Sequence, residues 1–299
     1  MTKKVLLTGA SGVLGWNFCK KMLNDYELVG TFFRNQPTDV NIEWKRINLL
    51  ETTQIPALIE ETKPDVVVHL AAIANAKFCE QHPALSHHIN VYTSVALAEA
   101  TKGAGIPMIF SSTDLVFNGN SAPYQEDDFC YPLSQYGMQK QTAEELLLND
   151  FEHVFVARFP LLFGPSPEYA TNFYTLTIDK LKEGEEIYVF TDEYRSMIST
   201  EIASEWLQKL INYSLDDTIP ENKKERLLHV GGKESCSRYD FTLKLAAKLG
   251  LNEALIIATQ QKELELIPPR PSNVSLDSSL ANDTLLYIAP SLDEQLAQL

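Results

Sequence analysis

The chain has 299 residues, of which 44% are hydrophobic and 22% charged, a composition typical of one large or two moderate globular domains. A formal net charge of −15 argues against binding to nucleic acid or to a membrane surface, because both interactions need a basic face. The four cysteines show no CxxC or metal-ligand spacing, so we expect free thiols. No apolar run is long enough for a signal peptide or a membrane span, so we expect a soluble, cytoplasmic protein.

Short runs rich in β-branched residues alternate with helical patterns over the first half of the chain. The predicted strands are 3–8, 26–33, 43–48, 65–71, 107–112 and 153–159, and the predicted helices are 12–25, 51–62, 78–103 and 133–149. The strands DVVVHLA and VFVARF are apolar on both faces, as in a parallel sheet covered by helices on each side. The pattern predicts an α/β, Rossmann-type doubly wound parallel sheet.

The regular alternation ends at the turn-rich segment GPSPEYATN, which begins at residue 164. The strands EIYVF and LLHV and a helix ending near 249 follow at irregular intervals, and Ser237 with Asp240 forms a capping-box-like start for that helix. We therefore predict an NADP-binding Rossmann domain over 1–163, to which some later elements return, and a smaller α/β lobe, mainly substrate-binding, over 164–299.

The segment TGASGVLG joins the first strand to the first helix and places Gly9, Gly12 and Gly15 three residues apart. Glycines here permit a tight turn, a close approach of a pyrophosphate to the helix N-terminus, and close packing of helix on strand. A purely structural strand-to-helix turn is the alternative reading. The predicted cofactor contacts of this turn also include Ser11, Val13 and Leu14.

The second predicted strand ends in TFFRN, where an acidic residue would accept hydrogen bonds from the adenosine ribose of NAD. Arg34 occupies this region instead, which favours a 2′-phosphate and hence NADP(H), with NAD(H) as the alternative cofactor. A surface arginine without a role is the other interpretation.

In YGMQK, Tyr136 and Lys140 are four residues apart on a predicted helix and therefore share one face. A phenol becomes a useful acid or base at neutral pH when its pKa falls by about 3 units, or about 4 kcal/mol, and a neighbouring ammonium favours that change. A surface tyrosine beside a surface lysine is the common alternative.

The segment FSSTDLVF ends a predicted parallel strand about two dozen residues before YGMQK. Ligands of such sheets bind beyond the carboxyl ends of the strands, so a hydroxyl of Thr113 or Ser112 could hold a substrate carbonyl beside the tyrosine. A hydroxyl, a tyrosine and a lysine after a glycine turn form a much more specific combination than any one of them.

These motifs resemble the extended short-chain dehydrogenase/reductases, and in particular the dTDP-4-dehydrorhamnose reductase family. The resemblance also covers HLAAIA, RFPLLFGP and RPSNVSLDSS, and so runs over nearly the whole chain. It implies that Thr113, Tyr136 and Lys140 are a catalytic triad. It further implies cofactor contacts at Ala71, Ala72 and Pro160, and at Asn48 and Leu49, where Asn48 replaces an aspartate that relatives often carry near the adenine.

The implied activity is NADPH-dependent reduction of a keto-sugar carried on a nucleotide. A nucleotide-sugar epimerase or dehydratase on the same scaffold, and a non-catalytic NADP-binding regulatory subunit, are the alternatives. Arg270 in PPRPSNVSLD and Arg195 in DEYRSMIS are predicted to bind the substrate diphosphate, or else to form structural salt bridges. For the oligomeric state, the interpretation is a homodimer.

Two further features were weighed as metal sites. His87 and His88 are adjacent on a predicted helix, so their side chains point about 100° apart and do not suit one shared metal. The acidic run EDD at 126–128 is typical of a turn between a strand and a helix. We therefore predict no metal site.

Overall fold

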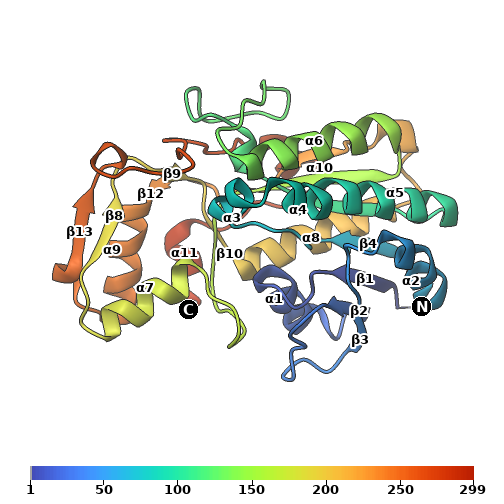
Figure 1. Ribbon diagram of the computed structural model, residues 1–299, viewed down its shortest axis with the longest axis horizontal. Coiled ribbons are helices and arrows are strands. Elements are labelled where there is room, and N and C mark those ends of the chain that lie inside the picture. Colours follow the sequence, from blue (N-terminus) through green and yellow to red (C-terminus); the bar gives the residue numbers. More distant parts are fainter. Residues whose placement is uncertain (1) are drawn as a thin grey trace.

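A computed structural model describes residues 2–299, and over this range seven strands form one parallel sheet (Figure 1). The strand order is β11-β6-β5-β4-β1-β2-β3, and each neighbouring pair is parallel. The strands are β1 (Lys4–Thr8), β2 (Glu27–Phe32), β3 (Glu43–Arg46), β4 (Val66–His69), β5 (Met108–Thr113), β6 (Val154–Phe159) and β11 (Leu227–His229). The order reverses direction at β1, so the predicted Rossmann-type doubly wound sheet is confirmed.

Helices cover both faces of this sheet. On one face lie α1 (Val13–Met22), α8 (Thr200–Ser214) and α10 (Ser279–Leu285), and on the other α2 (Ile55–Thr62), α5 (Thr93–Ala104) and α6 (Gln135–Asp150). The alternation of β1 explains the arrangement, because Val5 and Leu7 belong to the first apolar cluster while Leu6 belongs to the second. The strands that the sequence predicts to be apolar on both faces are thus covered by helices on both sides.

The helical stretch predicted over 78–103 is broken in the structure. It consists of α3 (Ala76–Gln81), α4 (Pro83–His87), a π-helical turn (His88–Tyr92) and α5. Proline lacks the N–H that would continue α3, so the backbone leaves the helical region at His82 (φ −133°) and restarts with Pro83 in the first turn of α4. The single long helix of the prediction is therefore wrong.

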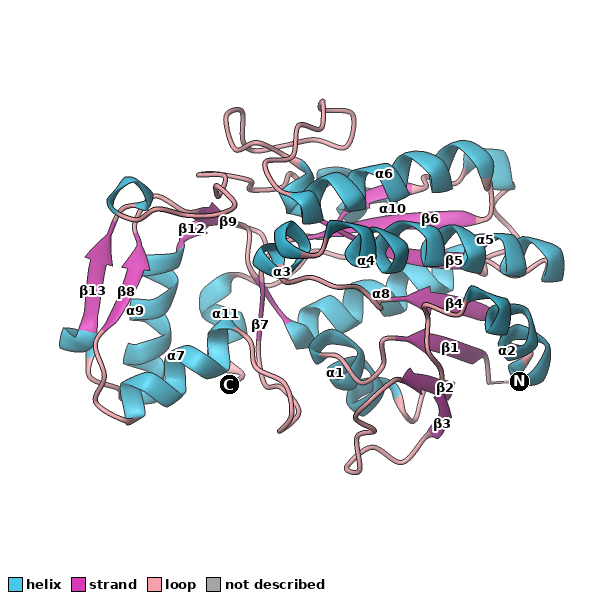
Figure 2. Ribbon diagram, in the orientation of Figure 1, coloured by secondary structure: helices cyan, strands magenta, loops and turns pink. Residues whose placement is uncertain are grey.

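A second group of elements packs around its own apolar cluster beside the sheet (Figure 2). It contains α7 (Phe173–Lys182), α9 (Arg238–Leu249), α11 (Leu292–Ala297) and the parallel pair of β8 (Ile187–Phe190) and β13 (Ile256–Thr259). As predicted, the Ser237 hydroxyl caps α9 by accepting a hydrogen bond from the Asp240 N–H at 3.0 Å.

Short strand pairs connect this smaller lobe to the large sheet. They are β7 (Leu162–Phe163) with β10 (Ile198–Ser199), and β9 (Tyr194–Arg195) with β12 (Cys236–Ser237). Although β11, α8 and α10 follow residue 164, they pack with the large sheet. The domain boundary at residue 163 remains a proposal. Between residues 2 and 299, the helices are too short or too polar to span a bilayer.

Candidate active site

The glycine turn follows β1 at the point where the sheet order reverses. Gly9 has φ +73°, and a Cβ there would lie 2.6 Å from the backbone nitrogen of Ala71. A Cβ on Gly15 would collide with the carbonyl oxygen of Gly9. Gly12 is the least crowded of the three, since its Cβ would meet only the Gly9 oxygen at 3.2 Å. Two of the predicted glycines are therefore required by the close contact of the turn with its neighbours.

The N-terminus of α1 lies directly behind this turn. No side chain caps the helix at Gly12, and its first turn contains no acidic residue. N–H groups at a helix N-terminus that no side chain caps, together with the helix dipole, attract an anion such as a pyrophosphate. The turn is thus suited to an anion; Ser11 lies in it, and Val13 and Leu14 begin α1 directly behind it.

The residues predicted near the adenosine follow the ends of β2 and β3. The Arg34 side chain is exposed, and its guanidinium carbon lies 5.7 Å from the centre of the Phe33 ring. Asn48 caps the following turn by accepting the Leu50 N–H at 3.2 Å, and Leu49 packs against the apolar cluster of α2 and α5. Both strand ends face the same edge of the sheet as Gly9, because all these strands are parallel.

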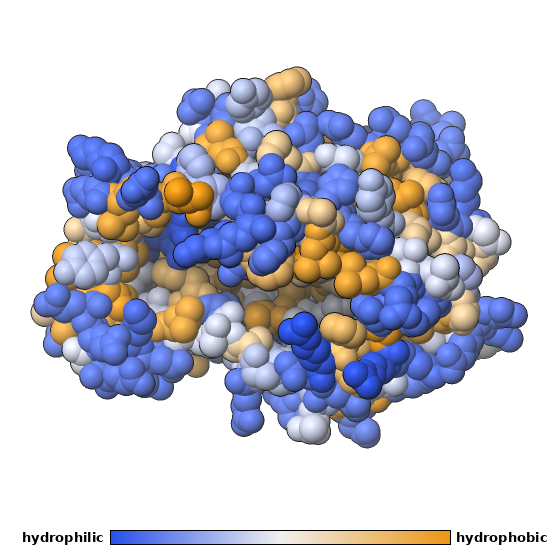
Figure 3. Space-filling model, viewed as in Figure 1, coloured by the Kyte–Doolittle hydropathy of each residue, from blue (hydrophilic) through white to orange (hydrophobic). Residues whose placement is uncertain are grey.

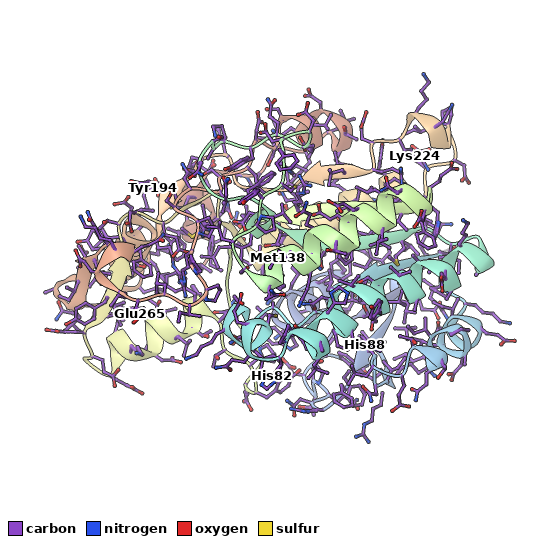
Figure 4. All side chains as sticks on the ribbon, turned by 45° about the horizontal axis from the view of Figure 1, so that its top comes forward. His82, His88, Met138, Tyr194, Lys224 and Glu265 are labelled. Atoms are coloured by element: carbon purple, nitrogen blue, oxygen red, sulfur yellow. The ribbon has the colours of Figure 1, made fainter. Side chains whose placement is uncertain are left out.

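Thr113, Tyr136 and Pro160 line one cleft of about 700 Å³ between the carboxyl edge of the sheet and the smaller lobe. In Figure 3 the surface is hollowed between the two parts of the molecule. In Figure 4, Tyr194 and Glu265 belong to the smaller lobe, and Met138 marks α6 on the large sheet. Ser112, the other hydroxyl considered, is buried outside this lining, and its Oγ has no partner in the described part of the chain. Thr113 is therefore the hydroxyl that reaches the cleft.

Tyr136 is buried in the first turn of α6. Ser134 caps this helix, and its hydroxyl accepts the Gly137 N–H at 3.1 Å. Burial raises the pKa of Tyr136 above its ordinary value, and the charges of Asp114 and Cys79 add to the rise, while a hydrogen bond with Thr113 opposes it. This differs from the lowered pKa expected from a neighbouring ammonium, because desolvation of the buried phenol is the largest effect. The phenol therefore keeps its proton at neutral pH, as a proton donor must.

Lys140 lies one turn further along α6 and is only 1% exposed. Its Nζ stands 3.8 Å from the centre of the Phe110 ring, a cation–π distance. Burial lowers the pKa of Lys140 to about 7, and the carboxylate of Glu144 partly opposes this shift.

Beneath the same region, His69 is bonded to the hydroxyls of Thr8 (Nδ1 to Oγ1, 2.6 Å) and Ser94 (Nε2 to Oγ, 3.0 Å). Burial, with a contribution from Lys140, lowers the pKa of His69 to about 3. This imidazole is therefore neutral and does not compete with Tyr136 as an acid.

Glu193 joins the arginines at the other wall of the cleft, and sequence reasoning missed it. Its Oε1 lies 3.2 Å from Nη2 of Arg195 and 3.1 Å from Nη1 of Arg238, and its Oε2 lies 3.3 Å from Nη1 of Arg270. These neighbours lower the pKa of Glu193 against the effect of its burial. The cluster is cationic, because its three guanidinium groups outnumber the carboxylates of Glu193 and Asp114 that face them.

The two predicted substrate arginines differ in this cluster. Arg195 is buried, and besides Glu193 it faces Asp114 (Nε to Oδ2, 3.4 Å) and donates to the carbonyls of Tyr194 and Pro271. Arg270 is 45% exposed, and Glu193 is its one ion-pair partner among residues 2–299. Arg238 was not predicted; its guanidinium stacks 3.9 Å from the Phe173 ring centre. The only available signal for it was its position at the start of a predicted helix.

The features weighed as metal sites have other contacts. His87 packs edge-on against Tyr92, and Glu126 accepts the backbone N–H of His229 at 2.7 Å. Asp128 accepts the backbone N–H of Gln125 at 2.7 Å, as an acidic turn residue commonly does. Over the described chain, no three His, Cys, Asp or Glu side chains are grouped as metal ligands.

The reversed parallel sheet and the glycine turn are features of an extended short-chain dehydrogenase/reductase, and Thr113 and Tyr136 line the cleft beside them. The family model described as RmlD substrate binding domain matches residues 3–299, and the chain belongs to this family. The resemblance to dTDP-4-dehydrorhamnose reductases noted in the sequence is thereby confirmed.

The proteins to which this chain is similar include both an enzyme subunit and reductases. The chain is 29% identical over 282 residues to methionine adenosyltransferase 2 subunit beta of Xenopus tropicalis, covering 93% of this chain and 81% of that protein. It is 24% identical to a probable low-salt glycan biosynthesis reductase of Haloferax volcanii, covering 98% and 96% of the two chains. The crystal structure of dTDP-4-dehydrorhamnose reductase from Bacillus anthracis in complex with NADP superposes with a TM-score of 0.83 at 24% identity, covering 100% and 98%. At that identity the superposition shows the fold.

Proposed function

We propose that this protein is an NADP(H)-dependent reductase of a keto-sugar nucleotide, similar to dTDP-4-dehydrorhamnose reductase. The observation that carries the proposal is one cleft lined by a protonated tyrosine, a threonine hydroxyl and a cationic cluster. The tyrosine and threonine suit a carbonyl, and the arginines suit the phosphates of a nucleotide. Because the whole chain carries a net charge of −15, an anionic substrate needs such a local positive charge.

The cofactor would be held at the glycine turn. The tight turn that Gly9 and Gly15 permit, the less crowded Gly12 and the uncapped start of α1 suit a pyrophosphate. Arg34 would pair with a 2′-phosphate, Asn48 and Leu49 would lie near the adenine, and Ala71, Ala72 and Pro160 would lie along the rest of the molecule. When bound, NADP(H) supplies the hydride for the carbonyl carbon.

The residues of the chain would then donate the proton and orient the substrate. Tyr136 donates its phenolic proton to the carbonyl oxygen, and Thr113 orients that oxygen. Lys140 holds the nicotinamide ribose and biases the tyrosine. Arg270, the most exposed arginine of the cluster, binds the diphosphate, and Arg195 lies behind it with most of its donors already used.

A non-catalytic regulatory subunit is the second candidate, because the Xenopus relative is named as a subunit of methionine adenosyltransferase 2. In that case the protein would bind NADP through the same turn and assemble with another enzyme.

A panel of 4-keto nucleotide sugars assayed with NADPH tests the proposal. Oxidation of NADPH with formation of a reduced sugar supports the reductase. Conversion of a sugar without net consumption of the cofactor would indicate an epimerase or dehydratase. Tight NADP binding with no turnover of any sugar would support the regulatory subunit and contradict the reductase.

A further inference from the structure

The single proton of the Thr113 hydroxyl already takes part in a hydrogen bond to Asp114. The Thr113 Oγ1 lies 3.2 Å from Oδ1 of Asp114, and it accepts the N–H of Leu115 at 3.2 Å. An ionised carboxylate can only accept, so Thr113 must be the donor to Asp114. In this state Thr113 has no proton left for a substrate carbonyl.

Asp114 lies directly behind the threonine and is 3% exposed. Its Oδ2 accepts no hydrogen bond from residues 2–299 and faces Nε of Arg195 at 3.4 Å, outside hydrogen-bond geometry. An incompletely satisfied buried carboxylate is costly to keep ionised.

The charged and titratable groups around Asp114 come from β9, from the residue before it and from α6. Arg195 of β9 favours the carboxylate, Glu193 disfavours it, and Tyr136 of α6 lies within range of its charge. Arg238 and Arg270 reach it only through Glu193. Burial raises the pKa of Asp114 to about 6, with Arg195 and Thr113 opposing the rise.

We propose that Asp114 is a positioning residue whose protonation decides whether Thr113 accepts or donates a hydrogen bond in the cleft. The ionised carboxylate takes the hydroxyl proton, so that Thr113 can only accept a hydrogen bond from a group in the cleft. The neutral carboxyl group, which can itself donate, releases that proton toward a substrate carbonyl. The second half of this proposal rests on the proposed reductase function.

The direction of the pH effect follows from this assignment. Above pH 6 Asp114 is ionised and Thr113 cannot donate, so kcat/KM for reduction should fall as the pH rises through about 6. Lys140, whose pKa is about 7, can add a second decline at higher pH. In Asp114→Asn the side chain is neutral at every pH, so the decline near pH 6 should vanish and the one near pH 7 should remain.

The hydrogen bond itself can be tested without any substrate. The carboxyl carbons of aspartate are labelled with ¹³C, and the Asp114 signal is the one that Asp114→Asn removes. Thr113→Val keeps the shape but removes the donor, so the pKa of Asp114 should rise by about half to one unit. Thr142→Val is the matched control, because the Thr142 hydroxyl donates to the Met138 carbonyl instead. Thr113→Ser retains a hydroxyl and should keep the wild-type value. An unchanged pKa in folded Thr113→Val would overturn the proposal.

The catalytic consequence is tested by kcat/KM profiles from pH 5 to 8 for the wild type and Asp114→Asn. Loss of the decline near pH 6 in the variant is the expected result, and the same decline in both proteins would overturn the role of Asp114. No turnover by the wild type with any keto-sugar would instead reject the proposed function. The titration, which needs no substrate, still decides whether Asp114 and Thr113 are linked.

Discussion

Glu144, one turn after Lys140 on α6, forms a buried ion pair with Arg158 of β6, with 2.7 Å between Oε2 and Nη2. Nε of Arg158 also donates to the same carboxylate at 3.1 Å. Because the Glu144 charge raises the pKa of Lys140 against its burial, this carboxylate stabilises the ammonium form of the candidate catalytic lysine.

Arg158→Met should destabilise the protein by about 3–5 kcal/mol, because it leaves Glu144 buried without its partner. Urea unfolding measures the loss. The double variant Arg158→Met with Glu144→Leu removes both charges and should recover most of the stability. A single variant that loses less than about 1 kcal/mol would contradict a tightly coupled pair.

Gly15→Ala should disrupt the glycine turn, because its Cβ would collide with the Gly9 carbonyl oxygen. We expect both a lower unfolding free energy and a loss of NADP binding, measured by thermal unfolding and calorimetry. Gly103→Ala on α5 is the control, since its Cβ would meet nothing within 4 Å. That substitution should raise stability by about 0.5–1 kcal/mol and leave binding unchanged. Equal effects of the two substitutions would show that the close contact at Gly15 is unimportant.

Tyr136→Phe should reduce turnover by at least about 100-fold while cofactor affinity stays nearly unchanged, because only the transferable proton is removed. Steady-state kinetics with NADPH and fluorescence titration of the cofactor measure the two quantities. Tyr131→Phe, at a side chain that is 60% exposed, is the control and should behave as wild type. Retained activity in Tyr136→Phe would remove the tyrosine from the mechanism.

Arg34→Asp should shift the cofactor preference from NADPH toward NADH, because the new carboxylate repels a 2′-phosphate and accepts ribose hydrogen bonds. We expect NADPH affinity to fall by about 10- to 150-fold. Lys182→Asp makes the same change of charge on the exposed surface of α7 and controls for the overall field. A wild type with equal affinity for the two cofactors would reject the assignment of Arg34.

Arg270→Ala should weaken sugar-nucleotide binding by about 10- to 150-fold with little effect on NADPH binding, because it removes a charge-assisted contact to phosphate. Its partly exposed ion pair contributes little to stability, about 1 kcal/mol at most. Arg195→Ala should instead lower the unfolding free energy by about 3–5 kcal/mol, since Asp114 and Glu193 lose a buried partner. Calorimetry and urea unfolding separate the two effects. Unchanged sugar-nucleotide binding in folded Arg270→Ala would place the diphosphate elsewhere.

Features that depend on local spacing could be predicted from the sequence. The order of strands and helices follows from runs such as DVVVHLA, and the glycine turn from three glycines directly after a strand. Tyr136 and Lys140 could be assigned to one face because a helix repeats every 3.6 residues. The break at Pro83 also has a local cause, the proline itself. The helical pattern on both sides of it nevertheless predicts one continuous helix, which the structure does not have.

The sequence by itself thus predicted the succession of strands and helices in the doubly wound sheet and the glycine turn, because each depends on neighbours along the chain. The candidate triad remains a prediction that rests on the resemblance to a family. Only the tertiary structure decided which arginines meet Glu193, since Arg238 and Arg270 are 45 and 77 residues away from it. Folding also decided the protonation of the site. Burial keeps the proton on Tyr136, makes His69 neutral and raises the pKa of Asp114 to about 6. Desolvation depends on everything that packs around a group, and no short segment of sequence specifies it.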